Sequence, residues 1–168
     1  MTEKPFVEIY TDGSCSGNPG PGGYAAILCY RNREKIITGS EQHTTNNRME
    51  LTAVIEALKY LKKPCKVIIR TDSQYVVNGV NQWLPEWIKK NWKTSSGKEV
   101  LNKDLWEKLL TVMSLHEVTF EWIPRNKHPK LALCDKLARK EVKNAYSMYP
   151  FSRTSKENHG GKMESETD

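Results

Sequence analysis

The sequence lacks the long apolar segments that mark membrane or secreted proteins. No run approaches the roughly 20 apolar residues of a transmembrane helix, and Met1–Pro5 begins no apolar signal region. The 168 residues contain no internal repeat either, which argues against a repeat architecture. We therefore expect one globular domain, in the cytoplasm and without a membrane partner.

Cysteine is scarce and has no metal-binding pattern. The four cysteines are Cys15, Cys29, Cys65 and Cys134. None is spaced as C-x-x-C, and no histidine pair lies beside them at zinc-finger spacing. This argues against structural zinc and against a disulfide framework. We expect reduced thiols that mostly pack in the interior.

Acidic residues are outnumbered, so the net charge is +6 and the pI about 9.1. Residues 152–168 carry three cations and four anions, so the other residues hold about +7. A mild basic excess is only a weak indicator of a polyanionic partner. We predict a folded domain over residues 1–151 and a disordered polar tail over residues 152–168.

Hydrophobic patterning predicts an α/β domain. Alternation or short apolar runs predict five strands, over residues 6–10, 24–30, 35–41, 67–69 and 117–123. Val118, Phe120 and Trp122 should point inward from the last strand. The glycine- and proline-rich segment 14–23 is expected to be a loop.

Helical periodicity separates these strands. It predicts a helix from about Met49 to Leu61, further helices over 74–92, 101–115 and 131–145, and an interruption near Pro85. Three strands joined by short links form an antiparallel meander, and the crossover that follows favours parallel, right-handed pairing. The result is a mixed five-stranded sheet in the order β-β-β-α-β-α-α-β-α.

Four carboxylates stand where predicted strands end or in predicted helices, namely Asp12, Glu50, Asp72 and Asp135. Taken singly, each has an ordinary explanation. Asp12 lies in an Asp-Gly turn dipeptide, and Glu50 follows Asn47 as in a capping box. Asp72 precedes a helix that it could cap, and Asp135 could be an exposed helical acid.

The predicted topology brings these acids together. Asp12 and Asp72 end strands that lie side by side if the crossover is parallel, and ligands gather at the carboxyl ends of such strands. Glu50 can join them only if its helix begins beside the end of the first strand. Four such acids would form a cage for hard divalent cations such as Mg2+.

Several ordered motifs carry a family resemblance. They are Tyr10–Cys15, Gly17–Tyr24, Thr44–Leu51, Thr71–Val76, Gln82–Trp83, Asn91–Thr94, Asp104–Trp106 and Cys134–Ala138. These motifs resemble bacterial ribonuclease HI, of the type 1 ribonuclease H family. The resemblance covers roughly residues 5–145. It implies a ribonuclease H-like fold with a basic helix–loop protrusion, in a monomeric, metal-dependent endonuclease.

The activity implied by the resemblance is hydrolysis of the RNA strand of RNA–DNA hybrids, leaving 5′-phosphate and 3′-hydroxyl ends. Asp12, Glu50, Asp72 and Asp135 match the family's metal ligands. Two Mg2+ ions would bind with the substrate, and Mn2+ could substitute for them. Two ions about 4 Å apart can activate the attacking water and stabilise the leaving oxygen.

The resemblance also implies contacts in the minor groove, where a 2′-hydroxyl distinguishes RNA from DNA. Asn18, Asn46 and Gln74 would hydrogen-bond there, and Cys15 would contribute its backbone. Glycines of the Gly17–Gly23 loop would let the backbone come close. The alternative is that this loop only connects a hairpin.

The DNA strand would be held by phosphate contacts. By resemblance, Thr45 would contact a phosphate, with Asn18 and Arg48 nearby. The protrusion would add Trp83 and a cluster of cations, Lys89, Lys90 and Lys93. Trp87, Trp92 and Trp106 are expected to pack the protrusion onto the body. The alternative for the lysines is an ordinary solvated face.

The loop before the last helix departs from the family. A glycine- and histidine-rich segment is usual there, and its first histidine is thought to help proton transfer or product release. Here His128 matches the second histidine, and the catalytic position falls on Arg125 or Asn126. Either the enzyme works without that histidine, or His128 or Arg125 substitutes for it.

Two alternative functions stand beside the ribonuclease, and the altered loop motivates the first of them. One is a hybrid-binding protein of the same fold with weak or no catalysis. The other is a different nuclease or strand-transfer enzyme on this fold, in which a basic, Trp-rich protrusion would be unexpected. The four acids favour the ribonuclease.

Overall fold

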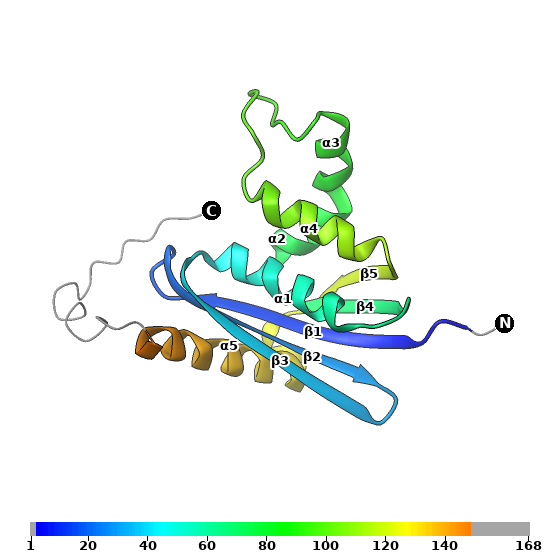
Figure 1. Ribbon diagram of the computed structural model, residues 1–168, viewed down its shortest axis with the longest axis vertical. Helices are drawn as coiled ribbons and strands as arrows, with labels where there is room; N and C mark the ends of the chain where they lie inside the picture. The colour runs from blue at the N-terminus through cyan, green and yellow to red at the C-terminus, as the bar shows by residue number, and fades with distance from the viewer. Residues whose placement is uncertain (1–2, 149–168) are drawn as a thin grey trace.

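The computed structural model describes residues 3–148, so the tail expected over residues 152–168 lies outside the described residues. Within them, no helix combines the length and apolar character that crossing a membrane requires. Figure 1 shows a central sheet with helices on both faces and one helical arm that stands away from it.

Five strands form one mixed sheet, as predicted, and their order across the sheet is β3-β2-β1-β4-β5. They are β1 (Phe6–Cys15), β2 (Gly20–Tyr30), β3 (Arg33–Thr44), β4 (Lys66–Thr71) and β5 (Glu117–Trp122). The first three pair antiparallel, and β4 pairs parallel with both β1 and β5. Thr11 of β1 lies opposite Thr71 of β4. Asp12 and Asp72 therefore follow paired residues and lie next to each other near the C-terminal ends of two inner strands.

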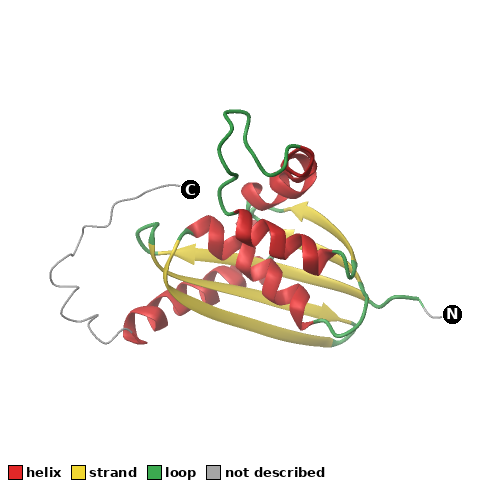
Figure 2. Cartoon of the chain, turned by 45° about the horizontal axis from the view of Figure 1, so that its top comes forward, coloured by secondary structure: helices red, strands yellow, loops and turns green. Residues whose placement is uncertain are grey.

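Helices cover the two faces of the sheet separately. They are α1 (Asn46–Tyr60), α2 (Gln74–Asn78), the π-helical η1 (Gly79–Trp83), α3 (Leu84–Lys89), α4 (Lys103–Met113), the 3-10 turn η2 (Arg125–Lys127) and α5 (Pro129–Met148). On one face, α1 and α4 pack over Val7, Ile9 and their neighbours. On the other, α5 packs against Tyr10 and Ile27 (Figures 1 and 2). The predicted helix over residues 74–92 is divided into three segments, and Pro85 is tolerated because it lies in the first turn of α3.

The prediction of a loop over residues 14–23 was wrong for most of that segment. Strand β1 continues to Cys15 and β2 begins at Gly20, because Ser14 pairs with Gly23 and Cys15 with Gly22. Here glycine serves close packing, since a Cβ on Gly23 would lie 2.4 Å from the carbonyl oxygen of Ala138 in α5. This glycine therefore lets α5 lie directly against β2.

Two further expectations concern individual side chains. Val118 and Phe120 pack against the core, but Trp122 does not point inward: it is 42% exposed at the edge of the sheet. Its Nε1 donates to the carbonyl oxygen of Asp72 at 3.1 Å, which gives its polar edge a partner there. The four cysteines are free thiols, as predicted, and Cys65 and Cys134 are buried.

Candidate active site

Close packing between α1 and β1 brings Glu50 to the end of the first strand. A Cβ on Gly13 would lie only 2.5 Å from the backbone nitrogen of Glu50, so α1 can begin here only over a glycine. Asp12 is 1% exposed and Glu50 is 4% exposed. The condition that the sequence left open, that this helix begins beside the end of β1, is met.

The ordinary explanations for three acids do not survive in the structure. Asp12 is a strand residue paired with Ala25, not a turn residue. The N-cap of α1 is Thr45, whose Oγ1 accepts from the backbone N–H of Arg48, so the expected capping box was wrong and Glu50 is no capping residue. The N-cap of α2 is Ser73, not Asp72. None of the three carboxylates therefore serves as a turn or capping residue.

Asp12, Glu50 and Asp72 form one cluster, in which one carboxylate oxygen of each lies within 4.8 Å of the others. Within residues 3–148, both carboxylate oxygens of Asp12 and Oε1 of Glu50 are buried without a hydrogen-bond partner. Leaving a buried polar atom unpaired costs about 1–3 kcal/mol, and more for a charged group. Partnerless, all-oxygen donors are the set that a hard divalent cation accepts, so these residues fit a metal.

Burial, and then mutual repulsion, disfavours the charged forms of the clustered acids. Burial, followed by the charges of Asp72 and Asp135, raises the pKa of Asp12 to about 7, although the Arg125 guanidinium opposes the shift. Burial, followed by the charge of Asp12, raises the pKa of Glu50 well above its ordinary value. Like charges in a poorly solvated site favour the protonated forms. A bound cation would reverse that preference.

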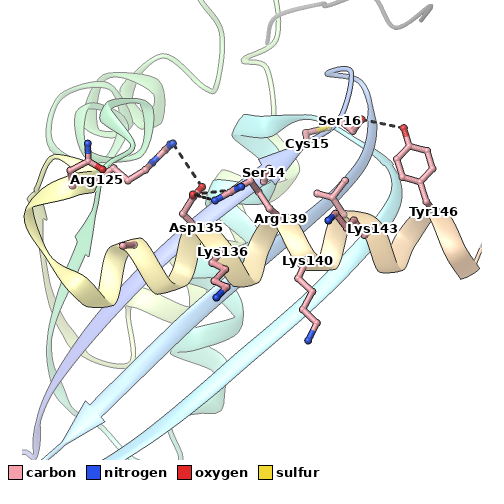
Figure 3. A pocket seen from close by; sticks show the side chains of 13 residues that line it. Ser14, Cys15, Ser16, Arg125, Asp135, Lys136, Arg139, Lys140, Lys143 and Tyr146 are labelled. Carbon is pink, nitrogen blue, oxygen red and sulfur yellow. Dashed lines mark hydrogen bonds and ion pairs between the residues drawn. The ribbon is translucent and has the colours of Figure 1, made fainter. Parts of the chain in front are cut away.

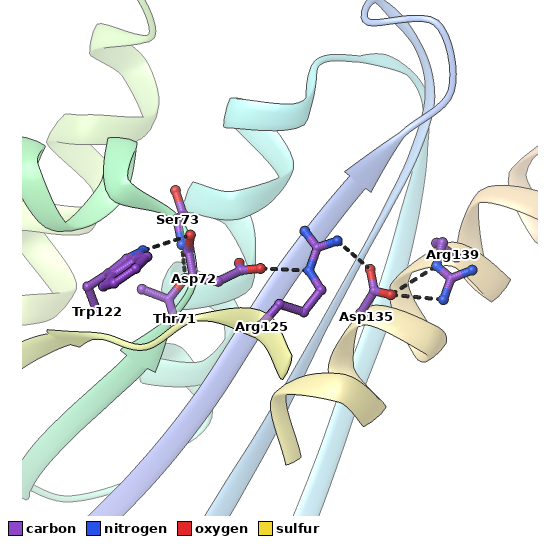
Figure 4. A network of polar contacts seen from close by, with 7 residues as sticks. All are labelled: Thr71, Asp72, Ser73, Trp122, Arg125, Asp135 and Arg139. Atoms are coloured by element: carbon purple, nitrogen blue, oxygen red, sulfur yellow. Dashed lines mark hydrogen bonds and ion pairs between the residues drawn. The ribbon is translucent and has the colours of Figure 1, made fainter. Parts of the chain in front are cut away.

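Arg125 links the fourth acid to this cluster. Its Nε donates to Oδ2 of Asp72 at 2.7 Å, and its Nη1 lies 3.8 Å from Oδ1 of Asp135 (Figure 4). Arg139, one turn further along α5, donates to Oδ2 of Asp135 at 2.8 and 3.1 Å. Asp135 is outside the three-residue cluster and connects to it through Arg125. The guanidinium groups of Arg125 and Arg139 therefore pair with Asp72 and Asp135, two acids that could otherwise bind a metal cation.

His128 has a different environment from Arg125. Its ring packs on Tyr10, with centroids 4.5 Å apart, and its Nε2 lies 3.2 Å from the Tyr10 hydroxyl. Its Nδ1 accepts from the backbone N–H of Lys130 in the first turn of α5. Both ring nitrogens are thus engaged. Asn126, the other residue at the expected catalytic position, is exposed in η2.

Comparison with known proteins agrees with this arrangement. Residues 4–143 match the sequence model of the RNase H family. The chain belongs to the ribonuclease H family. It is 54% identical to a ribonuclease H of Pelobacter propionicus over 137 residues, which cover 81% of this chain and 84% of that protein.

Two solved structures extend the comparison to the fold. LC9-RNase H1, described as a type 1 RNase H with the type 2 active-site motif, superposes with a TM-score of 0.78 at 30% identity, covering 86% of this chain and 75% of that one. LC11-RNase H1 in complex with an RNA/DNA hybrid gives a TM-score of 0.64 at 26% identity, covering 83% and 98%. The mixed sheet and its flanking helices are thus those of a ribonuclease H.

Outside the protrusion, six residues are expected to contact the minor groove or a phosphate of the hybrid. Five of these six residues lie around the start of α1. Oδ1 of Asn18 accepts from the backbone N–H of Asn46 at 2.6 Å, which ties the β1–β2 turn to this helix. The Cys15 thiol donates to the carbonyl oxygen of Thr44. Arg48 is held by a two-pronged ion pair with Asp104, and Thr45 caps the helix. Gln74 is exposed at the start of α2.

The arm seen in Figures 1 and 2 is the expected protrusion of the ribonuclease H fold. Trp106 is fully buried, and Trp87 and Trp92 pack against the main core, as predicted. Trp83 is half-buried, with its ring 5.8 Å from those of Tyr75 and Trp87. The lysines expected to bind phosphate, Lys89, Lys90 and Lys93, are exposed.

One group of cations near the acids was not recognised from the sequence. Arg139 contacts Asp135, and three lysines lie on the same helix at positions 136, 140 and 143. Their spacing of three, four and seven residues places them on one side of a helix. That spacing, on the helix that carries Asp135, was the signal available.

Proposed function

We propose that this protein is an endoribonuclease that hydrolyses the RNA strand of RNA–DNA hybrids and leaves 5′-phosphate and 3′-hydroxyl ends. The observation that carries the proposal is the cluster of buried, partnerless carboxylate oxygens of Asp12 and Glu50 beside Asp72. Hydrolysis in the ribonuclease H family depends on a divalent metal, and these residues supply the ligands that such a metal needs. The hybrid-bound LC11-RNase H1 supports the choice of substrate.

The acids would hold two Mg2+ ions, with Mn2+ as a substitute. Asp12, Glu50 and Asp72 would provide the oxygens that already converge, and Asp135 would complete the set after Arg125 and Arg139 move aside. When bound, such ions supply the positive charge that lowers the pKa of an attacking water and stabilises the leaving oxygen. The carboxylates would orient these charges.

The remaining residues would choose and orient the hybrid. Asn18, Asn46 and Gln74, with the backbone of Cys15, would reach the minor groove, where the 2′-hydroxyl is displayed. Thr45, with Arg48 beside it, would position a phosphate of the DNA strand. The protrusion would add Trp83 and the exposed lysines Lys89, Lys90 and Lys93, whose charge favours phosphate binding by counterion release.

One observation favours a second candidate function. Arg125, one of the two residues at which the family's catalytic histidine position falls, forms an ion pair with Asp72. A protein that kept this ion pair would bind hybrids but cut them slowly or not at all. The four acids argue for cleavage. A single assay of hybrid binding and cleavage distinguishes the two functions.

In this assay the protein is incubated with labelled RNA–DNA hybrid, double-stranded RNA or double-stranded DNA, in the presence of Mg2+, Mn2+ or a chelator. We expect cutting of the RNA strand of the hybrid only, and only with metal. Asp12→Asn, which keeps the side-chain volume, should abolish cutting but retain hybrid binding. Tight hybrid binding without cutting by either metal would establish the binding protein instead. Cutting by the Asp12→Asn variant would show that Asp12 is not essential.

We further propose that the protein is a cytoplasmic monomer whose catalytic domain spans residues 1–151. The proposal for the domain is supported by the charge contrast between residues 1–151 and 152–168. A chain ending at residue 151 should therefore cut hybrids at the rate of the full chain. A large loss of activity in that variant would assign a role to residues 152–168.

A further inference from the structure

A groove of about 910 Å³ lies next to the acid cluster, on the face of the sheet covered by α5. Ser14, Cys15 and Ser16 at the end of β1 form one wall (Figure 3). The other wall is α5, from Ala132 to Tyr146. Arg125 and Asp135 also line the groove, so it shares an acid with the proposed catalytic site.

The groove is strongly cationic. Its basic lining residues are Arg125, Lys136, Arg139, Lys140 and Lys143, and Asp135 is the one acid among the residues that line it. Arg139 points toward Asp135, whereas Lys136 and Lys140 extend from α5 away from the end of β1 (Figure 3). The lining therefore carries a net charge of about +4, which suits a polyanion.

Part of this charge has no internal partner. Lys130 is paired with Glu34 and Lys59 with Glu56, but within residues 3–148 no carboxylate pairs with Lys136 or Lys140. Lys136 and Lys140 are therefore available to neutralise phosphates of a nucleic acid, which then releases its condensed cations. From Lys136 to Lys143 the helix rises roughly 10 Å, the length of about three nucleotide steps along one strand.

The position of the groove selects one strand of the hybrid. The protrusion and α5 lie on opposite sides of the sheet (Figure 1), so a hybrid placed over the acids would reach both. The groove includes Asp135, so the strand that meets the acids can continue along α5. That strand is the one being cut, which is RNA. The DNA strand would then contact the protrusion.

We propose that this groove, the α5 groove, binds phosphates of the RNA strand adjacent to the scissile bond. The proposal rests on the proposed function, because it takes the strand at the acids to be RNA. It gives the protein a second cationic surface besides the protrusion. Lys140 and Lys143 are the binding residues that can be tested without touching Asp135.

The test is the salt dependence of hybrid binding. The double variant Lys140→Ala/Lys143→Ala is compared with Lys62→Ala/Lys66→Ala, which removes the same charge at the other end of the sheet, where β4 begins. Both pairs are exposed, and alanine is well tolerated in a helix. Dissociation constants are measured with Mg2+ in an Asp12→Asn background so that the hybrid stays intact.

Loss of two phosphate contacts should lower the slope of log K against log salt by about 2. The ratio of Kd for the Lys140/Lys143 variant to Kd for its parent should then shrink roughly tenfold between 50 and 200 mM salt. The Lys62/Lys66 control should keep the parental slope. An unchanged slope for the Lys140/Lys143 variant, or an equal change in the control, would overturn the proposal.

A second measurement identifies the strand. Hybrids carry 2′-O-methyl nucleotides next to the cut, joined either by neutral methylphosphonates or by ordinary phosphodiesters. Neutral linkages in the RNA strand should weaken binding of the parent but not of the Lys140/Lys143 variant. If only neutral DNA linkages do so, the groove binds DNA and the assignment fails. Wild-type protein that neither cuts nor binds hybrid would reject the proposed function itself, a separate outcome.

Discussion

Replacing Arg125 with alanine should strengthen the binding of divalent cations to the free protein. The Arg125 guanidinium donates to Asp72 at 2.7 Å and approaches Asp135 to 3.8 Å. A cation that uses both carboxylates must break these interactions first. Arg125 therefore competes with the metal, and its removal leaves Asp72 free to bind.

The magnitude follows from the exposure of the two partners. The Asp72 side chain is 10% exposed, but the Arg125 side chain is 51% exposed, so solvent screens the pair. An exposed ion pair contributes up to about 1 kcal/mol, and a hydrogen bond to a charged group about 1.5–3 kcal/mol. We take about 1–2 kcal/mol for this half-exposed pair. The Kd for the metal should then fall by a factor of about 5–30 in Arg125→Ala.

The assay is calorimetric titration of the protein with Mn2+ and with Mg2+ in the absence of nucleic acid. It is done at about pH 8, because Arg125 lowers the pKa values of Asp12 and Glu50, and its loss makes protons compete more strongly at lower pH. Arg33→Ala, an exposed arginine at the opposite end of the sheet, is the matched control.

Metal binding that is unchanged or weaker in Arg125→Ala would refute this reasoning. The variant also separates two roles for the residue. If Arg125 carries a proton in the reaction, its loss should reduce the rate by roughly 10²–10⁴-fold without tighter metal binding. If it only balances charge, the affinity should rise and the rate should change far less.

Two further predictions concern the neighbouring groups. His128→Ala should change the cleavage rate little, because both ring nitrogens are engaged by Tyr10 and the backbone of Lys130; a loss of several hundredfold in single-turnover assays would make His128 the proton carrier. Asp12→Asn should stabilise the metal-free protein at pH 8. There the wild type must bury a charged carboxylate whose pKa is raised from 3.8 to about 7, at a cost of up to about 4 kcal/mol. Between pH 7 and pH 4 the folded wild type binds more protons than the unfolded chain, so its stability should rise as the pH falls. The difference in unfolding free energy between Asp12→Asn and wild type should therefore shrink over that range. Denaturant titrations in which this difference does not depend on pH would contradict the shift.

The sequence was sufficient for the local structure and for the family. Alternation and helical periodicity predicted the order of the strands and helices, because side-chain burial in each element follows its own repeat. Parallel pairing after the crossover was favoured by the sequence, and the structure places that pairing between β1 and β4. Several ordered motifs, from Tyr10–Cys15 to Cys134–Ala138, carried the ribonuclease H resemblance. Glycine was misread over residues 14–23, where it allows close packing of strands as well as turns.

Only the tertiary structure decided what the charged groups do to one another. Glu50 meets Asp12 because α1 closes over Gly13, and Arg125 reaches Asp72 across 53 positions of sequence. The α5 groove likewise exists only where α5 packs beside the end of β1. Residue types and spacing determine which charges a segment carries. Whether two charges repel, pair or share a ligand depends on their separation and burial, which arise when distant segments pack together.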